Sequence, residues 1–164
     1  MNKVCFWAIA ALSVGACDKI PGSLEYEAHK GASALLKDPS SARFRNDSVN
    51  GSGAAVCGEI DGKNGFGAYN GFSKYVYVQS IGTRISRGEP DFEEYFRDTE
   101  NYNEYTFKDS YQKVQDACDF NEAWINFCPK DKVEGVVNYK EKCALFSNSG
   151  ISGQDKLKKM IRGY

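Results

Sequence analysis

The chain has 164 residues, of which 41% are hydrophobic, and it contains ten tyrosines and ten phenylalanines. This apolar and aromatic content is too high for a disordered chain, and the length fits one domain with a core of ordinary size. The formal charge is −1. A nucleic-acid-binding protein needs a strong basic excess, so the sequence predicts no nucleic-acid partner.

The N-terminus is organised like a bacterial lipoprotein signal peptide. A short cationic region precedes an apolar run over residues 4–14, which is too short to span a bilayer as a helix. Residues 14–17, Val-Gly-Ala-Cys, match the lipobox, in which small residues precede a cysteine whose thiol takes diacylglycerol. We expect removal of residues 1–16 and lipidation of Cys17. The alternative is an ordinary secretory signal cleaved at the same point.

A lipid on Cys17 predicts both a compartment and a membrane partner. Diacylglycerol with a further chain such as palmitate holds a protein stably at a membrane surface, because several acyl chains act together. Residues 17–23 then form a lipidated tether, and the protein faces the periplasm. Asp18 favours the inner membrane, if the rules of enteric bacteria apply.

A helix is predicted over residues 24–37, because apolar and small residues between Leu24 and Leu35 recur at helical spacing. The helix ends before Pro39, since the residue before a proline avoids helical geometry. His29 is the only histidine of the chain and lies beside the apolar stripe. Without a matching nucleophile, it is interpreted as a structural or solvated residue.

Three strands are predicted next, over residues 42–49, 54–60 and 73–80, where β-branched and aromatic residues alternate with others. The turn at residues 50–53, Asn-Gly-Ser-Gly, separates the first two strands. A loop over residues 63–72 separates the second and third. The three strands predict an antiparallel meander.

The rest of the chain is predicted to be helical. Residues 81–108 are interpreted as an insertion with one short helix. A long helix is predicted over residues 109–127 and a closing helix over residues 154–161. Between them, residues 132–146 are predicted to form another helix, although the valines there also allow a strand. Residues 24–164 are therefore expected to form a single α+β domain, with an N-terminal helix, a small antiparallel meander and helices packed on one face.

Cysteine usage fits an exported protein. The first 17 residues account for two of the six cysteines, since Cys5 leaves with the signal peptide and Cys17 carries lipid. The other four are Cys57, Cys118, Cys128 and Cys143. An even number predicts two disulfides, with three connectivities open, and spacing alone favours Cys118 with Cys128. No cysteine spacing is typical of zinc, so no metal or cofactor is expected.

The loop over residues 63–72 has two interpretations. As a binding loop, it exposes backbone amides at its glycines and offers polar and aromatic side chains. These candidates are Asn64, Phe66, Tyr69 and Phe72. As a structural connection, it uses its glycines for positive φ angles, and its aromatic side chains fill the core.

Three segments together resemble a group of small, uncharacterised proteobacterial and phage-borne exported proteins. Residues 36–46, LKDPSSARFRN, match that group's Lys-Asp-Pro-x-Ser-Ala-x-Phe-Arg-Asn segment. Residues 56–72, VCGEIDGKNGFGAYNGF, match its Cys-Gly-Glu segment, with Asp61 in place of the usual Asn, and residues 124–128, WINFC, match its Trp-x-x-x-Cys. The resemblance covers residues 24–80 and 119–128.

The group has no established activity to carry over, but it implies a disulfide. Its two usual cysteines correspond to Cys57 and Cys128, and this pairing leaves Cys118 with Cys143.

No residue is assigned a catalytic role, because carboxylates such as Glu59 and Glu93 are scattered and no nucleophile set occurs. We expect a membrane-anchored envelope lipoprotein that is not an enzyme and binds an envelope protein, a cell-wall component or a phage component. Immunity to a toxin, phage exclusion and inhibition of a wall hydrolase all fit. The alternatives are a cell-wall hydrolase using carboxylates and a structural envelope assembly factor.

Overall fold

The fold is that of a computed structural model, which describes residues 20–100, 104–133, 139–147, 158–159 and 161–163. The predicted signal peptide and Cys17, the expected site of lipidation, lie outside these residues. So does most of the helix expected over residues 154–161.

Four antiparallel strands form one sheet in the order β1-β2-β3-β4. They are β1 (Arg43–Val49), β2 (Ala55–Asp61), β3 (Ser73–Val78) and β4 (Gly82–Ile85). The first three confirm the predicted meander to within two residues at each end. β4 was missed, because residues 81–108 were expected to hold only a helix. With four residues, this strand is too short to show a periodic pattern.

The helices are α1 (Leu24–Ser33), α2 (Phe92–Glu100), α3 (Glu104–Phe127), α4 (Lys130–Val133) and α5 (Lys140–Ser147), with a 3₁₀ helix η1 (Pro39–Ser41). α1 ends four residues earlier than predicted, because the chain turns after Ser33 toward η1, which the carboxylate of Asp38 caps. α3 begins five residues earlier than predicted. α5 covers part of the helix expected over residues 132–146, and residues 134–138 lie outside the described chain.

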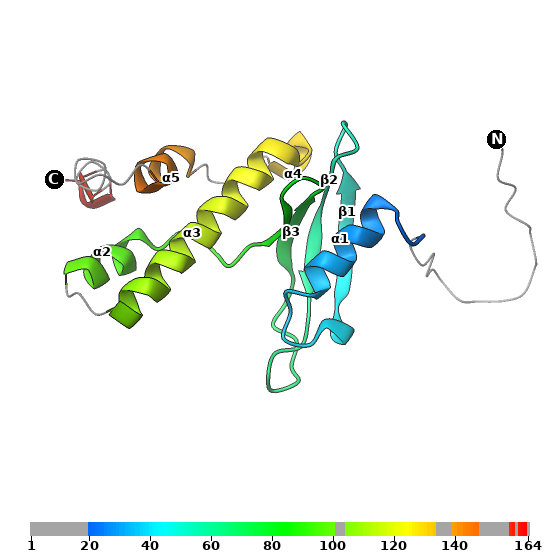
Figure 1. The fold of residues 1–164 in the computed structure, drawn as a ribbon, viewed down its shortest axis with the longest axis horizontal. Coiled ribbons are helices and arrows are strands. Elements are labelled where there is room, and N and C mark those ends of the chain that lie inside the picture. The colour runs from blue at the N-terminus through cyan, green and yellow to red at the C-terminus, as the bar shows by residue number, and fades with distance from the viewer. Residues whose placement is uncertain (1–19, 101–103, 134–138, 148–157, 160, 164) are drawn as a thin grey trace, which may run out of the picture.

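Helices cover both faces of the sheet (Figure 1). Side chains of neighbouring residues in β2 point to opposite faces, so Val56 and Ile60 pack against α1 while Ala55 and Cys57 pack against α3. Among the helices after the sheet, α3 and Val133 of α4 therefore pack on one face, and the N-terminal helix covers the other. Burial on both sides explains why β2 has almost no exposed residue. The predicted α+β class is confirmed.

A second core lies on the part of α3 that is distant from the sheet, where α2 and α5 pack beside it (Figure 1). Tyr95 and Phe96 of α2 and Phe146 of α5 are each at most 2% exposed. α3 thus belongs to both cores, with Val114 in the second one and Trp124 against the sheet.

Two disulfides join these parts. Cys57 of β2 bonds Cys128, just after α3, and Cys118 of α3 bonds Cys143 of α5. This pairing confirms the one implied by the resemblance. The pairing that spacing favoured, Cys118 with Cys128, is wrong because ten residues of helix span about 15 Å, well beyond disulfide reach.

None of the described helices combines the length and apolar character that crossing a membrane requires.

Candidate functional site

The loop over residues 63–72 is an ordered hairpin turn between β2 and β3. Lys63 and Tyr69 form an antiparallel bridge, and the amide of Asn64 donates to the carbonyl of Ala68 at 2.8 Å. The Asn64 side-chain oxygen accepts from the amides of Phe66, at 2.9 Å, and Ala68, at 3.1 Å. Gly67 has a φ of +79°, which a glycine adopts without strain. These bonds fix the backbone of the tip.

The aromatic side chains of this loop differ in their surroundings. Phe66 is 98% exposed at the tip, so it does not fill the core as the structural interpretation required. The Tyr69 hydroxyl donates to the carbonyl of Ser41 at 3.1 Å, which ties the loop to η1. Phe72 is half-buried. Of the four candidate binding residues, Asn64 and Tyr69 therefore stabilise the loop, while Phe66 is presented to solvent.

A row of charged side chains crosses the sheet beside this loop. The strand register places Arg45 next to Glu59, and Glu59 next to Lys74. Oε2 of Glu59 accepts from Nε of Arg45 at 2.6 Å and from Nδ2 of Asn46 at 2.9 Å. The bond from Arg45, followed by the bond from Asn46, holds the pKa of the Glu59 carboxyl below its usual value.

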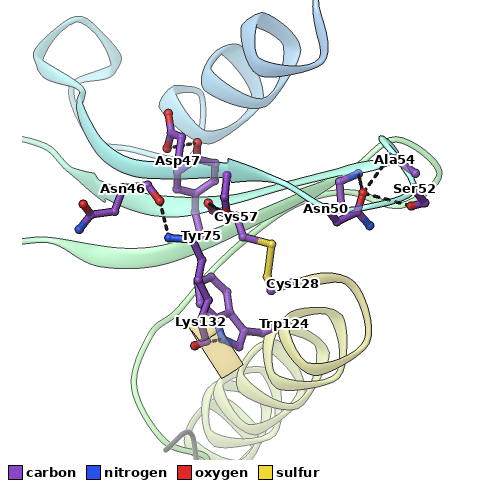
Figure 2. The surroundings of a disulfide bond; sticks show 12 residues. Asn46, Asp47, Asn50, Ser52, Ala54, Cys57, Tyr75, Trp124, Cys128 and Lys132 are labelled. Carbon is purple, nitrogen blue, oxygen red and sulfur yellow. Dashed lines mark hydrogen bonds between the residues drawn. A yellow bond between two sulfur atoms is a disulfide. The ribbon is translucent and has the colours of Figure 1, made fainter. Parts of the chain in front are cut away.

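Lys132 of α4 lies beside this row, and Figure 2 shows its hydrogen bonds to Asn46 and Trp124. Nζ of Lys132 donates to the carbonyl of Asn46 at 2.5 Å, and its own carbonyl accepts from Nε1 of Trp124 at 3.3 Å. Nζ of Lys74 lies 5.4 Å from the Trp124 ring centroid. α4 and the end of α3 are thus held against the sheet by side chains of this row as well as by the Cys57–Cys128 disulfide.

A second cluster of polar side chains lies on the opposite face, under α1. Nε2 of His29 lies 2.6 Å from Oδ2 of Asp47, and the Tyr75 hydroxyl donates to Oδ1 of Asp47 at 2.8 Å. The His29 ring stacks on Phe44 at a centroid distance of 3.6 Å. Burial, and then the adjacent Asp47 carboxylate, raise the pKa of Tyr75 well above its usual value. These contacts agree with a structural role for His29.

Asp47 reaches the α1 face because β1 contains a bulge. The register shifts between Arg45 and Ser48, so that two residues stand opposite Gly58, and Asn46 has a φ of +57°. A Cβ atom on Gly58 would lie 2.1 Å from Oδ1 of Asp47 and 2.8 Å from the Tyr75 ring. The absent side chain of Gly58 therefore makes room for the cluster.

Sequence reasoning missed Asp47 and Tyr75. The only sequence signal was a glycine, Gly58, inside an otherwise strand-like segment, which indicates a bulge or a close approach on the partner strand.

The carboxylates considered for hydrolysis are engaged in ion pairs on separate elements. Glu59 lies on β2 with Arg45, whereas Glu93 of α2 pairs with Arg162 at 3.0 Å, and Glu94 pairs with Lys113 at 3.1 Å. Within the described ranges, no group of three or more histidine, cysteine, aspartate or glutamate side chains is placed to hold a metal ion.

No protein-family model matches the sequence, and no curated protein and no solved structure is significantly similar to it. The fold and the site define a small α+β, two-disulfide protein that presents an ordered loop with an exposed aromatic tip.

Proposed function

We propose that this chain is a lipid-anchored protein of the bacterial envelope whose β2–β3 loop binds another envelope protein without catalysis. The observation that supports this proposal is Phe66, which is 98% exposed on a turn held by hydrogen bonds. Burying a phenylalanine side chain in an interface contributes on the order of 2 kcal/mol. An ordered loop loses little conformational entropy on binding, so more of that free energy is available for affinity.

The orientation of α1 supports a protein partner over the membrane. Leu36, which follows α1, lies against Gly62 at the start of the loop. The loop therefore lies near the C-terminal end of α1, while a tether over residues 17–23 joins its N-terminal end, about 15 Å away along the helix. The loop and the tether thus join opposite ends of α1, which leaves Phe66 accessible to a protein partner.

The proposed roles all require such a protein contact. Immunity to a secreted toxin, exclusion of a phage and inhibition of a wall hydrolase each need a rigid protein that blocks a partner in an oxidising compartment. Two disulfides suit that compartment. The resemblance to phage-borne exported proteins favours the same group of roles. A toxin gene beside this one would favour immunity.

Site-specific photo-crosslinking tests the loop directly. A photoreactive phenylalanine analogue at position 66 should give a discrete cross-linked product with one envelope protein in living cells. The same analogue at Tyr105, which is 86% exposed on α3, is the matched control and should not give that product. Equal products at both positions, or none at position 66, would contradict the proposal. Phe66→Ala should leave the free energy of unfolding within about 0.5 kcal/mol of wild type, because the ring is exposed.

Lipidation of Cys17 has its own test. We expect mass spectrometry of the mature protein to find Cys17 as the N-terminal residue with diacylglycerol on its sulfur. Cys17→Ser removes the only thiol at the cleavage site, so this variant should accumulate as unlipidated precursor that retains residues 1–16. An unmodified Cys17 at the mature N-terminus would contradict the anchor.

A further inference from the structure

Five cations lie on or beside the part of the sheet that α3 leaves uncovered. This cationic face consists of Arg43, Arg45 and Lys74 of the sheet, Lys63 of the loop and Lys132 of α4. Cys57 points toward α3, and side chains two residues apart in a strand share a face, so Glu59 and Asp61 point the same way. The register places Arg43 beside Asp61, and both Arg45 and Lys74 beside Glu59.

Carboxylates offset only part of this positive charge, since Glu59 and Asp61 share the face with five cations. Among the residues that the structure describes, the only salt bridge of the cationic face joins Arg45 to Glu59. By contrast, carboxylates of α2 and α3 such as Glu94 and Asp116 have their own cationic partners. A chain with a net charge of −1 thus concentrates cations beside the loop proposed to bind a partner.

Aromatic rings hold the two arginines in place. Cζ of Arg43 lies 3.7 Å from the ring centroid of Tyr69, and Cζ of Arg45 lies 3.8 Å from that of Phe72. A guanidinium that lies flat on a ring keeps N–H groups at its edge for a carboxylate, and its geometry matches the two carboxylate oxygens. The side-chain entropy lost on binding is reduced, because the stacking already restricts both side chains.

The spacing of the cations fits an extended peptide. Arg43 and Arg45 are two residues apart on β1, an edge strand, so their Cα atoms are about 7 Å apart. Alternate side chains of an extended peptide have the same repeat. A groove of about 370 Å³ continues the row, and this volume admits a side chain. Its lining is of mixed charge, with Lys74 and Lys132 beside Trp124 and with the acidic residues Asp47, Glu59 and Asp131.

We propose that the cationic face binds an extended acidic segment of the partner protein, with carboxylates at alternate positions that meet Arg43 and Arg45, while a further side chain of the segment enters the groove. This inference rests on the proposed function, because the same partner then contacts Phe66. Glu59 and Asp61 are the opposing charges within the face, so they weaken binding and set a threshold for how acidic the segment must be.

The probe is a short synthetic peptide of alternating glutamate and threonine, titrated by calorimetry into the soluble protein from residue 18 onward, with intact disulfides. Arg43→Gln combined with Lys74→Gln should raise Kd at least about tenfold, since each charged contact contributes on the order of 1 kcal/mol or more. Lys30→Gln combined with Lys108→Gln removes two exposed cations elsewhere and should leave Kd unchanged. Glu59→Gln should lower Kd about threefold, because it removes a like charge.

Two further probes separate this proposal from other anionic ligands. The peptide with glutamine at every glutamate should not bind. Tighter binding of polygalacturonate than of the peptide, or binding to phosphatidylglycerol vesicles that the Arg43 and Lys74 variants abolish, would overturn the peptide proposal. So would equal binding of the glutamate and glutamine peptides. If the peptide does not bind but the analogue at position 66 still gives its cross-linked product, only the inference about the acidic segment is contradicted. Peptide binding without the cross-link would contradict the role of the loop instead.

Discussion

Replacing Cys57 and Cys128 together by alanine is expected to lower the free energy of unfolding by about 4 kcal/mol. The bond joins residues 71 positions apart, so its loss frees a long loop in the unfolded chain. Cys57 is fully buried among Val76 and Trp124, so the shortened side chain also leaves a gap where the sheet meets α3. Since small proteins are stable by only about 5–15 kcal/mol, this loss is a large share of the total.

The Cys118–Cys143 bond supplies an internal comparison. Its partners are 25 positions apart, so its replacement by two alanines should cost about 3 kcal/mol, less than the first pair. Urea-induced unfolding without reductant, followed by tryptophan fluorescence and by circular dichroism, measures both. The opposite ranking would mean that native packing around Cys118, and not loop closure, dominates.

The sequence predicts those helices and strands whose residues follow a periodic pattern over a long enough segment. The aromatic and β-branched alternation of β3 and the three-to-four spacing along α3 each extend over six or more residues, which is enough for a pattern to emerge. β4 has four residues and takes its place from pairing with β3, which is a tertiary contact. No local sequence pattern indicates such a strand.

The candidate site was predictable only in part for the same reason. Glycine-rich turn chemistry and the resemblance located the loop that carries Phe66. The sequence did not tell Phe66 apart from Tyr69, because the difference arises where Tyr69 meets η1, 28 residues earlier in the chain. Asp47 likewise contacts His29 only because the bulge in β1 turns the Asp47 side chain to the opposite face of the sheet.

Replacing Gly58 by alanine is expected to destabilise the protein by about 3 kcal/mol, at the upper end for an overpacked core site. The added methyl group would lie 2.1 Å from the Asp47 carboxylate, which α1 and Tyr75 hold from the other side. The clash is relieved only if Asp47 moves, and that movement breaks the bonds of Asp47 to His29 and Tyr75. Gly51→Ala is the matched control, because no atom lies within 4 Å of its added Cβ and its φ is not positive.

A double-mutant cycle identifies the obstructing group. Asp47→Ala alone should cost about 2 kcal/mol, since it leaves the buried Tyr75 hydroxyl without its acceptor. Once Asp47 is removed, Gly58→Ala meets only the Tyr75 ring at 2.8 Å, so the double variant should be roughly 2 kcal/mol more stable than additivity predicts. Additive losses in urea-induced unfolding would instead assign the constraint on Gly58 to Tyr75. In that case, the bulge in β1 would be maintained by packing under α1 and not by the bonds of Asp47.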